Sequence, residues 1–180
     1  MNFSIQPILE NEKYQLIPLQ QGDFELLYEV ASDPKVWKQH PNKDRYKREV
    51  FENFFKGAIE SKGAFKIVER FSGEILESTR FYDFDESKNS IFIGYTFYGT
   101  NSWGKGINPQ IKKLMLDYIF QFVDKVYFHI GKENFRSQIA LERLGGKKIK
   151  EEEVAYFGEP TRTNFVYEIR RENNSNIDLN

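Results

Sequence analysis

The segment from Tyr98 to Pro109, Tyr-Gly-Thr-Asn-Ser-Trp-Gly-Lys-Gly-Ile-Asn-Pro, contains residue types that can bind a phosphate group. Gly104 and Gly106 lack a Cβ atom, so a bulky anion can approach the main chain closely at both positions. Lys105 lies between them and adds a positive charge. The segment therefore predicts an anion-binding turn, although a plain connection between two elements could need the same glycines for their backbone angles.

A strand and a helix flank this turn. Residues 91–97 are mostly apolar, with the β-branched and aromatic side chains typical of a strand. Asn108 is suited to the N-cap of a helix, and Pro109 to its first position, where a missing N–H costs nothing. Unpaired N–H groups and the positive end of the helix dipole would then face the turn. Apolar side chains follow at helical spacing, at Ile111, Leu114, Met115, Tyr118, Ile119 and Phe122.

Two kinds of phosphate loop match part of this pattern. The spacing from Gly99 to Lys105 matches the nucleotide-binding P-loop except at its last position. That position requires Ser or Thr, whose hydroxyl binds magnesium, and Gly106 occupies it here. No apolar strand ending in Asp follows to complete a magnesium site, so the sequence argues against ATP or GTP binding.

The other kind is the pyrophosphate loop with the pattern Arg/Gln-x-x-Gly-x-Gly/Ala, which aligns with Trp103 to Asn108. Only its central glycine, Gly106, matches strictly, because Trp103 replaces Arg or Gln and Asn108 replaces Gly or Ala. Together with the run from Ile93 to Thr96, this loop resembles a variant found among acetyl-CoA-dependent N-acetyltransferases of the GNAT superfamily. The variant belongs to the branch related to the ribosomal-protein N-terminal acetyltransferases.

Further segments extend the resemblance over roughly residues 74 to 170. Residues 78–82 resemble the third strand of that branch and residues 162–167 its last strand. Asn134 to Ser137 resembles its Asn-x-x-Ser motif, and Leu144-Gly145 its helix-ending glycine. The resemblance implies a GNAT fold, with the element order βααβββαβαββ and helices on both sides of a mixed sheet.

The local sequence pattern predicts the same order. After the helix that follows the turn, the chain reads as a strand, a second helix and a closing pair of strands. A strand, helix, strand unit implies a parallel strand pair within a mixed sheet. We expect one domain over residues 1–172 and a tail over 173–180 that is too polar to pack. The expected strands are 14–20, 64–71, 74–83, 90–98, 125–130, 147–156 and 163–170, and the expected helices are 23–31, 48–61, 109–122 and 135–144.

Composition limits the function classes. The 180 residues include 39% hydrophobic residues, with 17 Phe and 10 Tyr, which suits one core-forming domain. A formal net charge of −1, from 26 basic and 27 acidic residues, gives no electrostatic basis for binding nucleic acid or an anionic membrane. The first residues lack the pattern of a signal peptide and no apolar run could span a membrane, so we expect a cytoplasmic protein.

Absent residue types exclude several chemistries. The chain has no Cys, which rules out disulfides, thiolate metal sites and a cysteine nucleophile. His40 and His129 are its only histidines, which argues against a multi-histidine metal site as well. We expect no metal in the site, and a monomer or homodimer.

The resemblance implies which residues bind acetyl-CoA, the cosubstrate. Backbone groups at Phe97 and Tyr98 would pair with the pantetheine arm, and Asn134 would contact it. Asn134 could also be simply the N-cap of the helix that begins at Phe135. The pyrophosphate would lie on the N–H groups of the turn, formed by Trp103, Gly104, Lys105, Gly106, Ile107 and Asn108.

Acid and base are harder to assign. Many family members place Tyr seven residues after the Asn, where this chain has Leu141. In the related branch a Ser of this helix can protonate the leaving thiolate, which makes Ser137 the candidate acid. A Glu that positions a base water elsewhere in the family is replaced by Phe92, so His129 is the candidate base. Further candidates for the base are Glu77 and Asp83.

The resemblance implies acetyl transfer to a primary amine in a ternary complex. An α-amino group, with a pKa of about 8, needs less help to lose its proton than a lysine amine with a pKa of about 10.4. We therefore expect the N-terminus of a protein or peptide, or a small-molecule amine, as the acceptor. Lysine side chains, polyamines and aminosugars remain alternatives.

Because the usual Tyr and Glu are missing, a non-catalytic CoA-binding module is the second hypothesis. A backbone N–H at an irregular point between Tyr95 and Phe97 could stabilise charge on the thioester oxygen.

Overall fold

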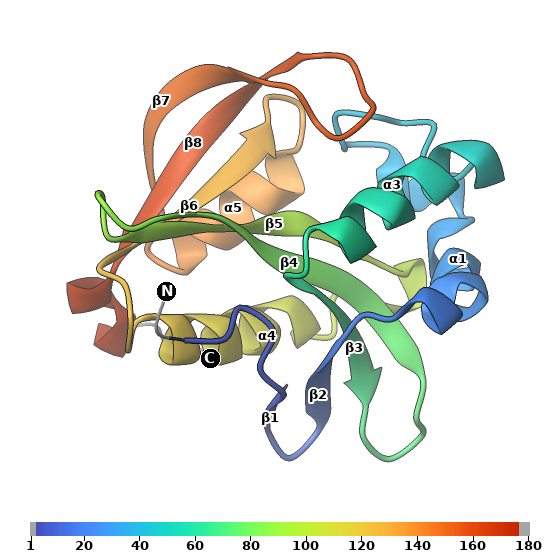
Figure 1. Ribbon diagram of the computed structural model, residues 1–180, viewed down its shortest axis with the longest axis horizontal. Helices are drawn as coiled ribbons and strands as arrows, with labels where there is room; N and C mark the ends of the chain where they lie inside the picture. The colour runs from blue at the N-terminus through green and yellow to red at the C-terminus, as the bar shows by residue number, and fades with distance from the viewer. Residues whose placement is uncertain (1–2, 177–180) are drawn as a thin grey trace.

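An eight-stranded mixed sheet is the centre of the computed structural model, which describes residues 3–176 (Figure 1). The strand order is β1-β2-β3-β4-β5-β6-β8-β7. The strands are β1 (Leu9–Glu10), β2 (Tyr14–Pro18), β3 (Ala64–Glu69), β4 (Ile75–Asp85), β5 (Ser90–Tyr98), β6 (Lys125–Gly131), β7 (Lys147–Val154) and β8 (Arg162–Arg170). The helices are α1 (Phe24–Ala31), α2 (Pro34–Trp37), α3 (Arg48–Glu60), α4 (Ile107–Ile119) and α5 (Phe135–Arg143), with 3-10 helices η1 (Gln21–Asp23), η2 (Thr100–Ser102) and η3 (Arg171–Asn176).

The predicted fold class, a mixed sheet flanked by helices, is confirmed. Strands β1 to β5 pair antiparallel in sequence order, and β5 pairs with β6 in parallel. The parallel pair arises because α4 carries the chain back along the sheet between these strands. Strand β8 lies between β6 and β7 and is antiparallel to both. Among the strands and α-helices of residues 3–176, only β1 and α2 were not predicted, because two and four residues are too short to show a period.

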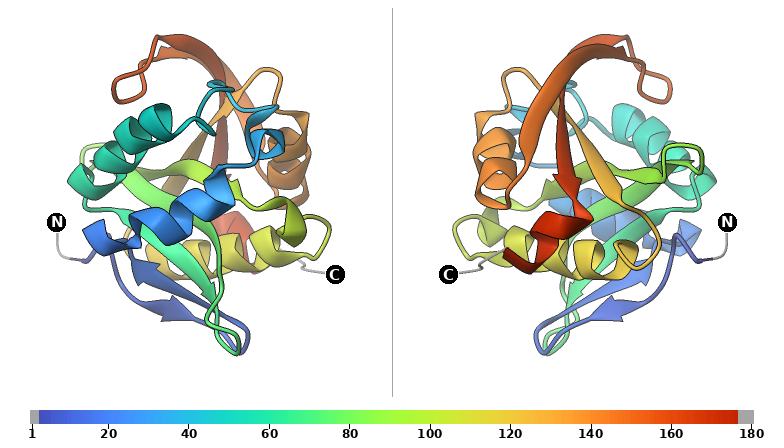
Figure 2. Two further views of the ribbon diagram at one scale, coloured as in Figure 1. Left: turned by 90° about the vertical axis from the view of Figure 1, so that its right-hand side faces the viewer. Right: turned by 90° about the vertical axis from the view of Figure 1, so that its left-hand side faces the viewer.

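Helices cover both faces of the sheet, and each face has its own apolar core (Figure 2). Alternate residues of a strand point to opposite faces, so one strand can supply both cores. The core beneath α1, α2 and α3 includes Leu27, Trp37, Phe51, Phe55 and Phe97. The core beneath α4 and α5 includes Ile91, Ile93, Ile111, Met115 and Leu141.

The connection between β7 and β8 reaches α3 (Figure 2). Asn53 of α3 donates a hydrogen bond from Nδ2 to the carbonyl oxygen of Phe157 over 2.9 Å. Arg45, in the chain between α2 and α3, binds both carboxylate oxygens of Glu159 over 2.7 and 2.8 Å. The side chains of this ion pair are only 4% and 6% exposed. The loop is therefore fixed over the α1–α3 face of the sheet.

Helix α4 begins two residues earlier than predicted. Its N-cap is Gly106 rather than Asn108, and Gly106 has a φ of 68°, a left-handed conformation that favours glycine. Pro109 becomes the third helical residue, which it can occupy because the first four N–H groups of a helix have no partner within it. The side chain of Asn108 lies in the first turn, where its buried Oδ1 has no hydrogen-bond partner among the described residues.

The polar tail differs in part from its prediction. Residues 173–176 do not separate from the fold but continue η3, and Asn174 donates from Nδ2 to Asp117 of α4 over 2.8 Å. A side-chain amide can bind a helix surface in this way without burying apolar area. The remaining residues of the predicted tail, 177–180, lie outside the described part of the chain.

Candidate functional site

A cleft opens where β5 and β6 separate. The two strands pair only at the start of each, from Ser90 with Lys125 to Phe92 with Tyr127. Beyond this point the space between them is lined from both sides and from α4 and α5. The lining residues include Thr96 and Tyr98 of β5, Trp103 and Asn108 of the turn, Lys112 of α4, His129 of β6, and Asn134, Ser137 and Leu141 at α5.

A bulge in β5 forms one wall of the cleft. Arg80 of β4 pairs with Gly94 and Ser78 pairs with Phe97, so β5 has one residue more than β4 between these pairs. Tyr95 lies in this longer stretch and has a left-handed backbone conformation, with a φ of 53°. A bulge leaves one residue outside the hydrogen-bond ladder. The irregular backbone expected between Tyr95 and Phe97 therefore lies beside the cleft.

The turn before α4 presents backbone without side chains. Gly104 and Gly106 have φ angles of 72° and 68°, and a Cβ added to either would have no atom within 4 Å. Within the described residues, no backbone N–H from residue 104 to 108 donates to a protein acceptor, and α4 has no side-chain cap. The turn thus has open space and free donors, as an anionic group requires.

Two cationic side chains lie at or near the turn, and one of them lines the cleft. Lys105 is exposed and does not line the cleft. Arg136, which does, has its guanidinium carbon 4.1 Å from the centroid of the Trp103 ring. Trp103 also donates a 3.3 Å hydrogen bond from Nε1 to the carbonyl oxygen of Tyr98. Sequence analysis missed Arg136 because only the docking of α5 against the turn brings it there.

Only some of the predicted cofactor-binding residues line the cleft. Tyr98, Trp103, Asn108 and Asn134 line the cleft. The side chain of Phe97 is buried in the core beneath α1, α2 and α3, so only its backbone can serve a ligand. Gly104, Lys105, Gly106 and Ile107 do not line the cleft but form the turn that joins Trp103 to Asn108, with the Ile107 side chain in the core beneath α4 and α5.

The start of α5 brings Asn134 and Ser137 together. Oδ1 of Asn134 accepts a 3.3 Å hydrogen bond from the backbone N–H of Ser137, so Asn134 is the N-cap of α5. Its side chain also lines the cleft, so both roles considered for it are compatible. The structure shows no hydrogen bond from the Ser137 hydroxyl to any described residue. That hydroxyl is therefore free to donate into the cleft.

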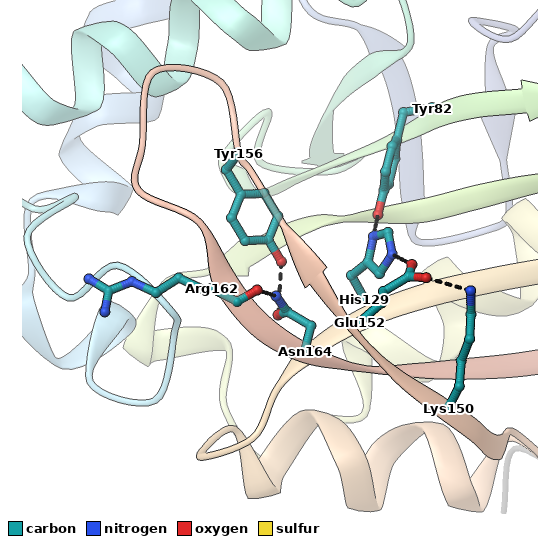
Figure 3. Close-up of polar contacts among 7 residues, drawn as sticks. All are labelled: Tyr82, His129, Lys150, Glu152, Tyr156, Arg162 and Asn164. Atoms are coloured by element: carbon teal, nitrogen blue, oxygen red, sulfur yellow. Dashed lines mark hydrogen bonds and ion pairs between the residues drawn. The ribbon is translucent and has the colours of Figure 1, made fainter.

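Both ring nitrogens of His129 are occupied (Figure 3). Nδ1 lies 3.0 Å from the hydroxyl of Tyr82, and Nε2 lies 2.5 Å from Oε1 of Glu152. His129 can therefore exchange a proton with a substrate only through a neighbour. The other candidate bases, Glu77 and Asp83, do not line the cleft; Glu77 is completely buried and Asp83 is exposed.

A buried polar cluster lies on the α4 side of the bulge. Nζ of Lys112 donates to the hydroxyls of Thr79 and Thr96 over 3.0 and 2.7 Å, and these hydroxyls lie 2.8 Å apart. Both carboxylate oxygens of nearby Glu77 lack a hydrogen-bond partner among the described residues. Burial raises the pKa of Glu77 to about 7 and lowers that of Lys112 to about 8, and each charge partly offsets the effect on the other.

The lining of the cleft includes an aromatic pair and three cationic side chains. Tyr95 and Tyr156 meet edge to face with ring centroids 5.4 Å apart. Arg45, Lys112 and Arg136 are the charged residues of the lining, and within the described residues no Asp or Glu joins them. Burial, together with Arg45 and Arg136, lowers the pKa of His40 to about 3, so this ring is neutral.

Two further properties bear on the class of protein. No helix in the described part of the chain is both long enough and apolar enough to cross a membrane. Residues 3–176 contain no group of three or more His, Cys, Asp or Glu side chains that could hold a metal ion.

Solved structures of N-acetyltransferases share this fold. A GCN5-related N-acetyltransferase from Brucella melitensis superposes with a TM-score of 0.78 at 18% identity, covering 96% of this chain and 84% of the other. Spermidine N-acetyltransferase from Vibrio cholerae, in complex with CoA and spermine, gives 0.69 at 15% identity, covering 92% and 99%. Mycobacterium smegmatis RimJ, in complex with CoA-disulfide, gives 0.68 at 15% identity, covering 92% and 87%.

The family itself follows from the sequence match. The model of the acetyltransferase (GNAT) domain matches residues 14–147, which include the bulged strand, the glycine turn and β6. Together with the open cleft, this match shows that the chain belongs to the GNAT family of N-acetyltransferases, which use acetyl-CoA as cosubstrate.

Proposed function

We propose that this protein transfers the acetyl group of acetyl-CoA to a primary amine, most readily an α-amino group. The observation that carries this proposal is the cleft between β5 and β6, which joins the bulge at Tyr95 to the uncapped start of α4. One end has the free N–H groups that an anion needs, and the other has aromatic walls. The two ends suit the two substrates of an acetyl transfer.

The residues of the cleft fit acetyl-CoA. The N–H groups of residues 104–108 and the Arg136 guanidinium would hold the phosphates, because both favour negative charge. Backbone groups of Phe97 and Tyr98, and the side chain of Asn134, would pair with the pantetheine arm. When bound, acetyl-CoA supplies the acetyl group as an activated thioester.

Two groups of the chain would act on the thioester. An N–H freed by the bulge at Tyr95 would stabilise negative charge on its oxygen, a contribution on the order of 3 kcal/mol for one donor. The hydroxyl of Ser137 would donate a proton to the leaving sulfur. The chain has no Cys to carry the acetyl group. Transfer would then pass directly to the amine, in a ternary complex.

The charges of the cleft favour one class of acceptor. Its lining has three cationic side chains and, among the described residues, no carboxylate. A polyamine would find no carboxylate among these lining residues to pair with its further ammonium groups. An α-amino group carries a single charge and loses its proton at a pKa of about 8, so it suits this cleft better than a polyamine.

A non-catalytic CoA-binding module is the second candidate. Leu141 and Phe92 stand where many family members have an acid and a base-positioning residue, and this observation favours it. Binding and turnover separate the two candidates. The module would bind acetyl-CoA and release no CoA with any amine.

Thermal unfolding and an amine panel test the proposal. Acetyl-CoA at 100 times its dissociation constant should stabilise the protein by about 2.7 kcal/mol, and ATP with magnesium should not. CoA release would then be measured with a peptide α-amine, a blocked lysine peptide, spermidine and an aminosugar. We expect the fastest release with the peptide α-amine. Stabilisation by ATP-magnesium alone would refute the assignment.

A further inference from the structure

We propose that the buried ammonium group of Lys112 positions the bulge of β5 and adds positive charge beside the N–H that would stabilise the thioester oxygen. Lys112 would act through the hydroxyls of Thr79 and Thr96, so it is a positioning residue and needs no contact with either substrate. This inference rests on the proposed function. It explains a buried charge that neither the core nor the binding of acetyl-CoA requires.

The hydrogen bonds of Lys112 lead to both neighbours of Tyr95. Its Nζ donates to the hydroxyls of Thr79 and Thr96 over 3.0 and 2.7 Å. The Thr79 hydroxyl donates to the carbonyl oxygen of Gly94 over 3.4 Å, so the proton between the two hydroxyls, which lie 2.8 Å apart, comes from Thr96. Gly94 precedes Tyr95 and Thr96 follows it. Lys112 therefore fixes the chain on both sides of the bulged residue.

The backbone at Tyr95 needs this support. Its φ of 53° lies in the left-handed region, which residues other than glycine rarely adopt and which persists where the surroundings fix it. On the α3 face of the sheet, the guanidinium carbon of Arg80 lies 3.8 Å from the centroid of the Tyr95 ring. On the α4 face, the two threonine contacts of Lys112 hold the flanking residues. The bulge is thus held from both faces of the sheet, and its freed N–H keeps one direction.

Lys112 also places its charge beside the cleft. Lys112 and Thr96 line the cleft, and Lys112 is only 5% exposed. Little water screens a charge at this depth, so it acts more strongly on a nearby charge than it would at the surface. Negative charge develops on the thioester oxygen as the amine attacks. A positive charge already fixed next to the bulge stabilises that oxygen without rearrangement.

A structural role alone does not account for these charges. Glu77 is completely buried, and within the described residues neither of its carboxylate oxygens has a hydrogen-bond partner. Glu77 and Lys112 therefore interact through space and not as a hydrogen-bonded ion pair. Burying two charges in this way costs stability, and apolar side chains would join α4 to the sheet at lower cost. Charges retained at such a cost are common at functional sites.

Glu77 keeps the proton on Lys112. Burial lowers the pKa of Lys112 to about 8, and the charge of Glu77 opposes that shift. The other charged and titratable groups around the pair are Tyr14 of β2, Tyr98 of β5, His129 of β6 and Arg136 of α5. A neutral Lys112 amine still has two N–H groups for the two threonines. Rising pH therefore removes the charge but not the hydrogen bonds, which separates an effect of the charge from a structural one.

The test uses three variants and two matched controls. Glu77→Gln/Lys112→Met removes both charges without leaving one of them buried alone. Glu77→Gln removes only the opposing charge, from a residue that does not line the cleft. Thr96→Val keeps the charge and removes its link to the bulge. The controls are Lys113→Met, at the next residue of α4, and Glu74→Gln, an exposed carboxylate just before β4.

The measurement is a pH profile with the amine that the parent acetylates fastest, at saturating acetyl-CoA. Each kcat/KM for the amine is divided by the fraction of free amine at that pH, so that the profile reports the protein. The corrected kcat/KM of the parent should fall about tenfold or more as pH rises through about 8, where Lys112 loses its proton.

Each variant should change this profile in its own way. The double variant should stay at or below the lower value at every pH, while acetyl-CoA raises its unfolding temperature as it does for the parent. Glu77→Gln should move the fall to lower pH, because Lys112 has lost the opposing charge. Thr96→Val should be slower at every pH and keep the fall where the parent has it. Both controls should match the parent.

Several results would overturn the role of Lys112. An active parent without the fall, or a Glu77→Gln variant with the parent's profile, shows that the charge of Lys112 does not act on the reaction. A double variant as fast as the parent contradicts both the charge and the positioning. If the double variant loses its activity together with the stabilisation by acetyl-CoA, the role is structural. A parent that acetylates no amine of the panel contradicts the proposed function itself, and the role of Lys112 falls with it.

Discussion

Gly106 leaves open space at the start of α4. Its φ of 68° and the empty space around its missing Cβ leave the backbone N–H groups open. In Gly106→Asp, a carboxylate would occupy the position proposed for the pyrophosphate and repel it. We expect this variant to lose CoA binding by calorimetry while its unfolding temperature falls by only a few degrees.

Gly73→Asp is the matched control for this change. Gly73 has a φ of 75° and no atom within 4 Å of an added Cβ, but it lies in the turn between β3 and β4. The same backbone strain therefore arises away from the cleft. If Gly106→Asp binds CoA like Gly73→Asp, the glycine turn is only a connection.

Removing the hydroxyl of Ser137 tests its proposed role as the acid. The caps of α5 use its backbone N–H, so removing the hydroxyl leaves the bond to Asn134 intact. Ser137→Ala should therefore fold normally and bind acetyl-CoA normally. If its hydroxyl protonates the leaving sulfur, turnover should fall by about 10²-fold, measured as kcat for CoA release. An unchanged kcat would remove Ser137 from the mechanism.

Between α4 and the sheet, Glu77 and Lys112 make stability depend on pH. The pKa of Glu77 is raised from 4.5 to about 7, so its contribution to stability is full below 4.5 and is lost as pH rises through about 7. The pKa of Lys112 is lowered from 10.5 to about 8, so its contribution is full above 10.5 and is lost as pH falls through about 8. The folded state is therefore penalised most between these two values.

Replacing both charges should relieve this penalty. The double variant Glu77→Gln/Lys112→Met removes two buried charges and leaves the Thr79–Thr96 hydrogen bond. We expect its free energy of unfolding to exceed that of the parent by about 1–4 kcal/mol near pH 7.5, and by clearly less near pH 5. Urea unfolding at both pH values measures the difference. An equal difference at the two values would show that titration of this pair does not matter.

The β7–β8 loop depends on a buried ion pair. Glu159→Gln leaves Arg45 buried without an opposing charge, which costs about 3–5 kcal/mol of unfolding free energy. We also expect faster hydrogen exchange in residues 155–161. Glu151→Gln is the control, because Glu151 pairs with Lys132 at the surface, where side chains 52% and 45% exposed make a pair worth only about 0–1 kcal/mol. Equal losses in the two variants would show that the loop is held by other contacts.

At the level of elements, periodicity was a good guide, whereas the cap rules held at Asn134 and failed at Asn108. The bounds of β5 match the predicted 90–98 because its apolar run ends at the glycine turn. The start of α4 was misplaced because Asn108 and Pro109 have strong cap preferences, and the left-handed Gly106 overrode them. The bulge at Tyr95 was expected from the resemblance alone, since nothing local to β5 requires it.

Across the whole molecule, contacts between sequence neighbours could be predicted, whereas contacts between distant strands could not. Ser137 and Asn134 are neighbours in sequence, so a motif could place them together. Arg136 and Trp103 meet only because α5 packs against the turn. The contacts of His129 join β4, β6 and β7, and this register depends on the complete sheet. No local pattern encodes it.

The most direct test of the proposed acetyl transfer is to locate the acetyl group on a product. The parent protein would be incubated with acetyl-CoA and a peptide that has both a free α-amino group and a lysine side chain. Fragmentation mass spectrometry would then place any added acetyl group. We expect one acetyl group, on the α-amino nitrogen, formed only when protein and acetyl-CoA are both present. Acetyl-CoA binding without an acetylated product from this peptide or any amine of the panel would contradict catalysis and favour a CoA-binding module.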